Sequence, residues 1–313
     1  MVLSTLYLLI NITNDMKITV TGSLGHIGRT LTEILMEKGA ELKVISSNPE
    51  RKKSIEEFGA TAAIGSLEDV GFLVENFKGA AAVFTMVPPN NYFDPNLDLI
   101  AYYKRLGENY AKAISEANVK HVVNLSTIGG HLEEGNGILK GAYYVEETLN
   151  KLPSGISITH IRPTSFYYNL YGYMETIKSD GAIYANYGNS PIPWVSPEDI
   201  AQAVAEELTR LNSGRKIRYV ASEELTGDQT AEILGKAIGR PELKWQLISD
   251  EAVTDRLKAI GMNPGIAEGL TELYAGLRTG LLAEDYQKNK PQPMGKVKLK
   301  DFAKEFARIY HNN

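Results

Sequence analysis

Short hydrophobic runs alternate with amphipathic segments through the first half of the chain. The runs predict buried strands, and the apolar residues between them recur at helical spacing. Strands are predicted at residues 18–20, 41–46, 61–64, 80–86, 119–126 and 156–161, and helices at 67–77, 102–117 and 141–151. This alternation is typical of a parallel sheet that is covered on both faces. We therefore predict an α/β fold with a Rossmann doubly wound parallel sheet.

The second half of the chain is mainly helical. Its predicted strands are short and lie at residues 182–186, 192–195, 217–221 and 243–248. Strand 217–221 is expected to join the main sheet. A helix at 197–211 is expected to begin with Ser196 as its N-cap and Asp199 at position N3. The basic, proline-containing segment 288–300 indicates a loop before the last helix.

These elements suggest two lobes that share one crevice, with no linker between them. We assign residues 16–164 and 191–221 to a Rossmann domain. Residues 165–190 and 222–313 are assigned to a smaller, mainly helical substrate lobe. Residues 1–15 are interpreted as an amino-terminal extension that precedes Met16, with a signal peptide or an extra strand as alternatives.

Composition narrows the possible functions. The 313 residues carry a formal net charge of −5, and no basic stripe is interleaved with aromatic residues, so direct nucleic-acid binding is not expected. Cysteine is absent, and the five histidines lack metal-ligand spacing, so we predict no metal site. The apolar residues 1–15 are too few to span a bilayer and have no positively charged start. We expect a cytoplasmic monomer or homodimer with no membrane attachment.

A glycine-rich turn follows the first predicted strand. Gly22, Gly25 and Gly28 stand in a G-x-x-G-x-x-G spacing between that strand and an amphipathic helix. Glycine allows a positive φ at position 22, a bare backbone for a pyrophosphate at 25, and close packing of the helix on the strand at 28. The residues expected to bind the pyrophosphate are Gly22, Ser23, Leu24, Gly25, His26, Ile27 and Gly28. The turn predicts a dinucleotide cofactor.

The end of the second strand favours NADP(H). No acidic residue stands there to bind a ribose hydroxyl, whereas Ser46, Ser47 and Arg51 can donate hydrogen bonds to a 2′-phosphate. Glu50 weakens this argument. Arg51-Lys52-Lys53 can also be a solvated helix face that pairs with Glu56 and Glu57. NAD(H) therefore stays possible.

Other cofactor contacts are expected where further parallel strands end, because ligands of such sheets lie beyond the carboxyl edge. The candidates are Ser66, Met86, Val87, Ser126, Thr127 and Pro163. Thr127 and the backbone after Arg162 are expected to hold the nicotinamide end. The crevice at this edge is thus the predicted site.

Several motifs together resemble the NmrA-like family of atypical short-chain dehydrogenases. They are TGSLGHIG at 21–28, SNPERKKSI at 47–55, VVNLSTIG at 122–129, VEETL at 145–149, HIRPTSFYYN at 160–169 and VSPEDIAQAVAEEL at 195–208. The resemblance extends from Met16 to the last helix. It implies a Rossmann fold, NADP(H) binding and one of two roles: a quinone-reductase-like or azoreductase-like enzyme, or a regulator that senses NADP(H).

The chain departs from that family at two positions. Ser66 stands where many members have an aspartate that faces the adenine. Ala142 stands where many members have a lysine near the nicotinamide ribose, and Lys140 is a possible substitute. The resemblance therefore does not assign the usual catalytic groups.

The catalytic residues are not assigned by the sequence. The Tyr-x-x-x-Lys pair of the wider superfamily is absent, since Glu147 and Thr148 stand four residues after Tyr143 and Tyr144. The candidates are Thr127, Tyr143 and His131, although His131 can equally be a solvated loop residue. A quinone-type acceptor avoids the need for an acid, because solvent can supply its proton.

An aromatic segment follows the sixth strand. Phe166, Tyr167 and Tyr168 are the predicted substrate residues, with Tyr171 and Tyr173 nearby; core packing is the alternative for all of them. The small-molecule substrate itself is not identified. The sequence predicts an NADPH-dependent oxidoreductase that reduces a small conjugated acceptor, with a non-catalytic NADP(H) sensor as the alternative.

Overall fold

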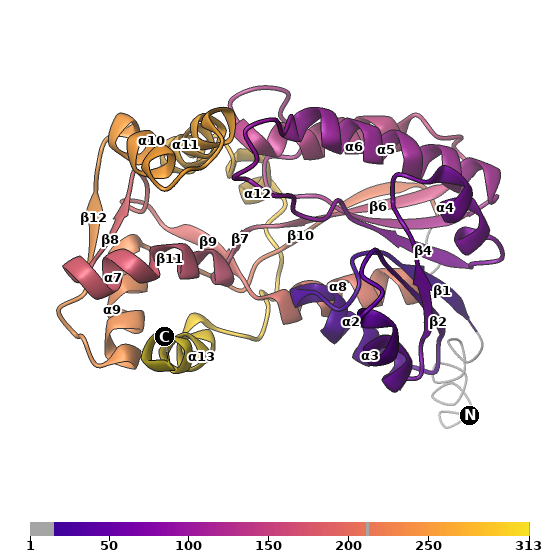
Figure 1. Ribbon diagram of the computed structural model, residues 1–313, viewed down its shortest axis with the longest axis horizontal. Helices are drawn as coiled ribbons and strands as arrows, with labels where there is room; N and C mark the ends of the chain where they lie inside the picture. The colour runs from indigo at the N-terminus through magenta and orange to yellow at the C-terminus, as the bar shows by residue number, and fades with distance from the viewer. Residues whose placement is uncertain (1–15, 211–212, 313) are drawn as a thin grey trace.

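The computed structural model describes residues 16–210 and 213–312, and its two lobes lie side by side in Figure 1. The predicted extension 1–15 and Leu211, the predicted end of the 197–211 helix, lie outside the described residues. The first lobe consists of β1 (Lys17–Val20), α2 (His26–Glu37), β2 (Glu41–Ser46), α3 (Arg51–Glu57), β3 (Thr61–Ile64), α4 (Val70–Phe77), β4 (Ala82–Thr85), α5 (Leu99–Glu116), β5 (His121–Leu125), η1 (Gly137–Leu139), α6 (Lys140–Asn150), β6 (Ser157–Pro163), α8 (Pro197–Thr209) and β10 (Arg215–Val220).

The first lobe contains a seven-stranded parallel sheet in the order β10-β6-β5-β4-β1-β2-β3. Val20 of β1 is in register with Val44 of β2 on one side and Phe84 of β4 on the other. The chain leaves β1 toward β2 and β3, then returns to β4 and continues in the opposite direction. The carboxyl ends of β1 and β4 therefore form the switch point where ligands of such sheets bind.

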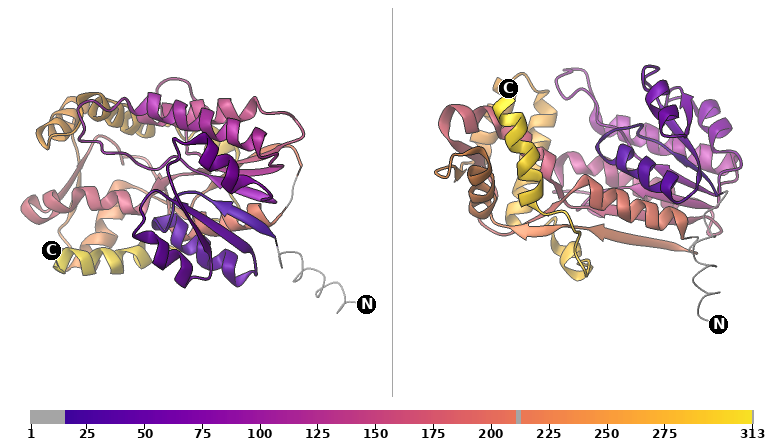
Figure 2. Two further views of the ribbon diagram at one scale, coloured as in Figure 1. Left: turned by 45° about the vertical axis from the view of Figure 1, so that its right-hand side comes forward. Right: turned by 90° about the horizontal axis from the view of Figure 1, so that it is seen from below.

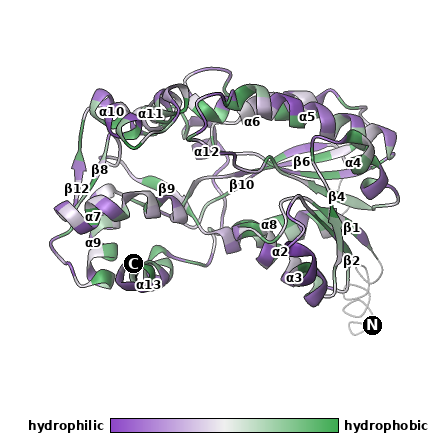
Figure 3. Cartoon of the chain, in the orientation of Figure 1, coloured by the Kyte–Doolittle hydropathy of each residue, from purple (hydrophilic) through white to green (hydrophobic). Residues whose placement is uncertain are grey.

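Helices cover both faces of this sheet. One hydrophobic core joins the sheet to α2, α3 and α8, and a second joins it to α4, α5 and α6. The sheet strands carry mostly hydrophobic residues, whereas α3 and α5 carry many hydrophilic ones (Figure 3). The predicted doubly wound fold is confirmed, including the position of β10 in the main sheet. The hydroxyl of Ser196 accepts a hydrogen bond from Asp199 N, as expected for the cap of α8.

The second lobe contains the chain's carboxyl-terminal helix and two small sheets (Figures 1 and 2). Its sheets have the strand orders β11-β9-β7 and β12-β8. Its elements are β7 (Ser165–Phe166), η2 (Tyr167–Tyr173), α7 (Met174–Asp180), β8 (Ala182–Ala185), β9 (Ile192–Val195), β11 (Glu223–Leu225), α9 (Gly227–Ile238), β12 (Lys244–Leu247), α10 (Asp250–Ala259), α11 (Pro264–Thr279), α12 (Glu284–Lys288) and α13 (Leu299–Asn312).

Strand β9 lies at the boundary between the lobes. The sequence places residues 191–221 in the Rossmann domain, but β9 pairs with β7 and β11 instead of the main sheet. Trp194 packs in the core of the second lobe, while Val195 packs in the Rossmann core. An alternating strand can contribute to two cores in this way because its side chains point to opposite faces. Among the described residues, no helix is long and apolar enough to cross a membrane.

Candidate cofactor and acceptor site

Gly22 and Met86 bring the glycine turn and the end of β4 together. Gly22 has a φ of 93°, and a β-carbon there would lie 2.9 Å from the sulfur of Met86. Met86 N donates to Oγ1 of Thr21 at 3.0 Å, and the hydroxyl of Tyr110 donates to Met86 O at 2.7 Å. The turn is therefore fixed against β4, and a side chain at position 22 would disturb both elements.

Gly25 and Gly28 have different roles in the turn. A β-carbon at Gly28 would overlap the carbonyl oxygen of Ser23. Glycine is thus needed at position 28 because the start of the helix lies against the turn. The sequence had suggested that the helix packs closely on the strand there. Gly25 is exposed, and the nearest atom to a β-carbon there would be Gly22 O at 3.5 Å. Position 25 accordingly has room for a ligand against bare backbone.

The turn offers unpaired polar groups that fit an anion. Ser23 has a φ of 54°, and its hydroxyl is buried without a hydrogen-bond partner among the described residues. No side chain caps the amino terminus of α2, where the N–H groups of His26 and Ile27 lie. Free N–H groups at a helix start bind phosphate well. The residues present therefore fit the diphosphate of a dinucleotide.

The loop after β2 presents Ser47 and Arg51 at the surface. Lys52 pairs with Glu56 at 4.0 Å and Lys53 with Glu57 at 3.9 Å, whereas Arg51 pairs with no carboxylate of a described residue. Lys52 and Lys53 therefore match the alternative interpretation, a solvated helix face that pairs with Glu56 and Glu57. Ser46 is buried, and its hydroxyl accepts from Asn48 N at 3.1 Å. The Ser46 hydroxyl also donates to Asn48 O at 3.3 Å, so it is engaged within the turn, and its contact with a phosphate stays a prediction.

The remaining cofactor candidates lie at or beyond the carboxyl ends of β3, β4, β5 and β6. Ser66 is exposed beyond β3, where its hydroxyl accepts from Glu68 N at 3.1 Å. Thr127 follows β5, and Ile128 N donates to Pro163 O at 2.8 Å, which joins the ends of β5 and β6. Met86 and Val87 are half-buried beyond β4. Ser66 therefore lies on the side expected for the adenine, whereas Thr127 and Pro163 lie at the strand ends expected for the nicotinamide.

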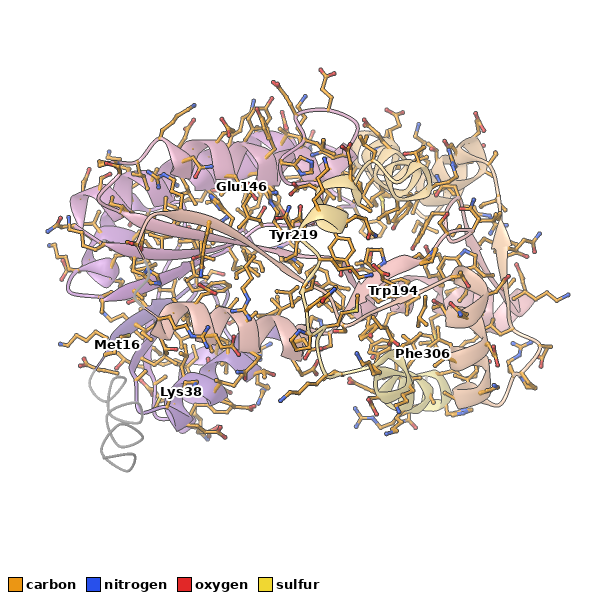
Figure 4. The ribbon with its side chains drawn as sticks, turned by 180° about the vertical axis from the view of Figure 1, so that it is seen from behind. Met16, Lys38, Glu146, Trp194, Tyr219 and Phe306 are labelled. Atoms are coloured by element: carbon orange, nitrogen blue, oxygen red, sulfur yellow. The ribbon has the colours of Figure 1, made fainter. Side chains whose placement is uncertain are left out.

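Ser126 belongs instead to a buried ionic network. Its hydroxyl donates to Glu146, and its predicted contact with the cofactor stays a prediction. Glu146 accepts from Nη2 of Arg162 at 2.6 Å and from Nε at 2.9 Å, and Arg162 also contacts Asp285 at 3.0 Å. Tyr219 donates to Asp285 at 2.7 Å, and Figure 4 shows Glu146 and Tyr219 near one another between the lobes. The network joins the Rossmann floor to α12.

The electrostatics of this network keep Arg162 charged. Burial alone would lower the pKa of Arg162, but its hydrogen bonds to Glu146 and the charge of that carboxylate raise the pKa overall. Sequence reasoning missed Glu146, Tyr219 and Asp285 as parts of the network. The available signal was Arg162 itself, a charged residue near the end of a strand predicted to be buried, since a buried charge needs a partner.

The pKa shifts of His131 and Tyr143 do not favour proton donation near neutral pH. Burial and then the charge of Arg162 lower the pKa of His131, and its Nδ1 is buried without a partner among the described residues. Burial and then Glu133 raise the pKa of Tyr143. The ammonium of Lys140 lies 6.0 Å from the ring centroid of Tyr144, and Ala142 is buried. A neutral histidine and a neutral phenol therefore lie on this side of the crevice.

Three aromatic rings connect the glycine turn to the second lobe. His26 stacks on Tyr168 with ring centroids 4.6 Å apart, and Tyr168 stacks on Phe166 at 4.9 Å. Phe166 and Tyr168 are half-buried and stand close to the end of β6 in the sequence. The stack therefore lies beside the predicted nicotinamide end.

Tyr167, in contrast, is a core residue, so its predicted substrate role is wrong. Its side chain is 0% exposed, and its hydroxyl donates to Glu223 at 2.7 Å. Tyr171 stacks on Phe306 at 5.5 Å, and the hydroxyl of Tyr173 bonds that of Tyr187 at 3.2 Å. The alternative interpretation, core packing, applies to these three tyrosines.

A sequence model of the NmrA-like family matches residues 14–281. The NAD(P)H azoreductase of Xenophilus azovorans is 26% identical over 82% of this chain and 86% of its own length. A (4-alkanoyl-5-oxo-2,5-dihydrofuran-3-yl)methyl phosphate reductase of Streptomyces griseus is 27% identical over 85% of this chain and 89% of its own.

Solved structures share the fold. An NADPH-dependent quinone oxidoreductase from Escherichia coli, solved with NADPH, has a TM-score of 0.78 and 20% identity, and covers 92% of this chain and 99% of its own. The triphenylmethane reductase of a Citrobacter species has a TM-score of 0.76 and 21% identity, covering 93% and 99% respectively.

Proposed function

We propose that this chain, which belongs to the NmrA-like family, is an NADPH-dependent oxidoreductase that reduces a small conjugated acceptor such as a quinone or an azo compound. The observation that carries the proposal is the joint presence of a phosphate turn with unpaired donors and an aromatic stack beside the nicotinamide end. Named relatives with reductase activity on conjugated molecules support it. The cytoplasmic location and the choice between monomer and homodimer stay predictions.

The cofactor is held by groups along the carboxyl edge of the sheet. The backbone of 22–28 and the hydroxyl of Ser23 bind the diphosphate, because they offer unpaired donors at the positive end of α2. Ser47 and Arg51 bind the 2′-phosphate, for which a guanidinium is well suited. Thr127 and the backbone near Pro163 hold the nicotinamide end.

When bound, NADPH supplies a hydride, and the acceptor takes up that hydride and one proton in a two-electron reduction. Neither His131 nor Tyr143 is favoured as a proton donor near neutral pH, since the pKa of His131 is lowered and that of Tyr143 is raised. The chain contributes orientation: the half-buried stack of Phe166, Tyr168 and His26 forms an aromatic wall beside the nicotinamide end, against which a planar acceptor can pack. Water supplies the proton, which suits an acceptor whose charge is delocalised.

The test is consumption of NADPH, followed by absorbance at 340 nm, with a panel of quinones, azo dyes and simple carbonyl compounds. We expect turnover with the conjugated acceptors and little with the aliphatic carbonyls. Tight NADPH binding without turnover across the panel would contradict the proposal and favour the alternative, a non-catalytic sensor. A protein partner that binds only at one NADPH to NADP⁺ ratio would then identify the sensor role.

A further inference from the structure

A long loop without helix or strand connects β4 to α5. It comprises residues 86–98, contains three prolines and is named here the β4–α5 loop. Loops of this length inside a compact domain are uncommon, and they usually serve as active-site lids or binding loops. This loop begins at the carboxyl end of β4, which is part of the switch point of the sheet, and Figures 1 and 2 show it crossing to the helices of the second lobe. It therefore spans both lobes beside the predicted nicotinamide end.

The first lobe fixes the two ends of the β4–α5 loop. Met86 N donates to Oγ1 of Thr21 at 3.0 Å, and the hydroxyl of Tyr110 donates to Met86 O at 2.7 Å. At the other end, the carboxylate of Asp98 accepts from Ala101 N at 2.8 Å and caps α5. Both ends are therefore held by hydrogen bonds that do not involve the second lobe.

Asn263 of the second lobe fixes the middle of the loop. Its backbone N–H donates to Tyr92 O at 2.9 Å, and its Nδ2 donates to Asp94 O at 2.9 Å and to Leu97 O at 3.4 Å. Among the described residues, every hydrogen bond that joins this loop to the second lobe comes from Asn263. The residue is only 8% exposed, so these bonds are shielded from water. One residue thus makes the polar connection between the loop and the second lobe.

The oxygen of the same side-chain amide starts α11. Oδ1 of Asn263 accepts from Gly265 N at 2.9 Å and from Ile266 N at 3.3 Å, as an N-cap does. The loop and the helix start are therefore held by opposite ends of one amide group. Aspartate caps a helix about as well as asparagine but has no N–H to donate, so a substitution can separate the two roles.

We propose that the β4–α5 loop forms a wall of the acceptor site and that Asn263 is the positioning residue that holds this wall against the second lobe. The inference rests on the proposed function and adds a residue that determines the affinity for the acceptor. Because Thr21 and Tyr110 hold Met86 independently of Asn263, release of the middle of the loop leaves the cofactor end in place. The acceptor then meets a wall that is closed for only part of the time, which weakens its apparent affinity.

The experiment measures two calorimetric Kd values. One is that of 1,4-naphthoquinone on protein saturated with NADP⁺, which cannot reduce it, and the other is that of NADP⁺ itself. In Asn263→Asp we expect the Kd of the quinone to rise about fivefold, as the loss of one hydrogen bond would give, and the Kd of NADP⁺ to stay unchanged. An unchanged Kd of the quinone, or an equal rise in both values, would overturn the proposed wall.

Limited proteolysis measures the position of the loop directly. Phe93, between the two residues whose carbonyl groups bond to Asn263, is 52% exposed and offers a cleavage site for chymotrypsin. Cleavage requires the segment to open, so its rate follows the population of the released loop. We expect faster cleavage after Phe93 in Asn263→Asp than in the unsubstituted protein. An unchanged rate would overturn the positioning role of Asn263.

Two further variants separate this role from general stability. Asn263→Ser keeps an oxygen that can cap α11 and introduces no charge, and it should behave like Asn263→Asp. Ser249→Ala is the matched control, because it removes the cap of α10, where Oγ of Ser249 accepts from Ala252 N at 3.2 Å, and leaves the loop untouched. Equally weakened quinone binding in Ser249→Ala would overturn the proposal. Because neither the Kd values nor the cleavage needs turnover, an inactive protein would contradict the proposed function without deciding the role of Asn263.

Discussion

Glu146 and Arg162 form a buried ion pair beneath the nicotinamide end, with Nη2 and Oε2 2.6 Å apart and side chains 5% and 3% exposed. The pair links α6 to the end of β6, and Arg162 continues to Asp285 of α12. One buried guanidinium therefore fixes both the floor of the cofactor site and the position of the second lobe.

Replacing one partner of this pair should strongly destabilise the protein. Glu146→Ala leaves Arg162 with less charge compensation in a buried site, and the free energy of unfolding should fall by about 3–5 kcal/mol. Urea denaturation measures this. The surface pair of Lys53 and Glu57 is the control, since Glu57→Ala should cost less than about 1 kcal/mol. Equal losses in the two variants would show that the buried pair has no special role.

Arg51 should set the preference between cofactors. Arg51→Ala removes a guanidinium that pairs with no described carboxylate, so the Kd of NADPH should rise about tenfold or more while that of NADH stays the same. Fluorescence titration measures both. Lys53→Ala is the matched control, because Lys53 lies on the same helix but pairs with Glu57. A similar loss for both cofactors would place the 2′-phosphate elsewhere.

Gly25 and Gly28 should respond differently to alanine. Gly28→Ala forces a β-carbon onto the carbonyl oxygen of Ser23, so we expect a lower melting temperature together with loss of cofactor binding. Gly25→Ala has room for its methyl group in the free protein, and should keep the melting temperature while weakening cofactor binding. A thermal melt with and without NADPH distinguishes the two. Normal NADPH binding by Gly25→Ala would contradict the prediction that the cofactor lies against bare backbone at position 25.

Stability should fall as the pH drops through the range of histidine titration. Burial lowers the pKa of His121 and of His160 in the folded state. The unfolded chain thus binds more protons below about pH 6.5, and folding stability, fully present above that pH, is lost as the pH falls. Urea midpoints between pH 8 and pH 5 measure the slope. The variant His121→Gln should show a shallower slope, and an unchanged slope would exclude a contribution from His121.

The fold could be predicted because its strands, turns and helix caps are determined largely by residues that are close together in the sequence. The strand 61–64 and the strand 41–46 match the structure residue for residue, since each is a short segment between two turns. The glycine turn and the cap at Ser196 depend on neighbouring residues alone. The sheet to which β9 belongs could not be predicted, because its pairing with β7 and β11 depends on contacts distant in the sequence.

Side-chain direction was the part of the site that the sequence could not provide. Ser46 and Ser126 stand at strand ends as expected, yet their hydroxyls bond to Asn48 N and Glu146. Tyr167 and Tyr168 are adjacent in the sequence, but one enters the core and the other stacks on His26. Two adjacent tyrosines look alike in the sequence even when their side chains point to opposite sides. Only the tertiary contacts show which of them is in the core.

The central claim is that the chain transfers a hydride from NADPH to a conjugated acceptor held beside the aromatic stack. The most direct test mixes the protein anaerobically with one equivalent of NADPH and excess 1,4-naphthoquinone and follows the absorbance at 340 nm. We predict complete loss of NADPH absorbance with formation of one quinol per NADPH, and a slower rate when the transferred hydrogen is deuterium. NADPH that binds but is never oxidised would contradict the claim.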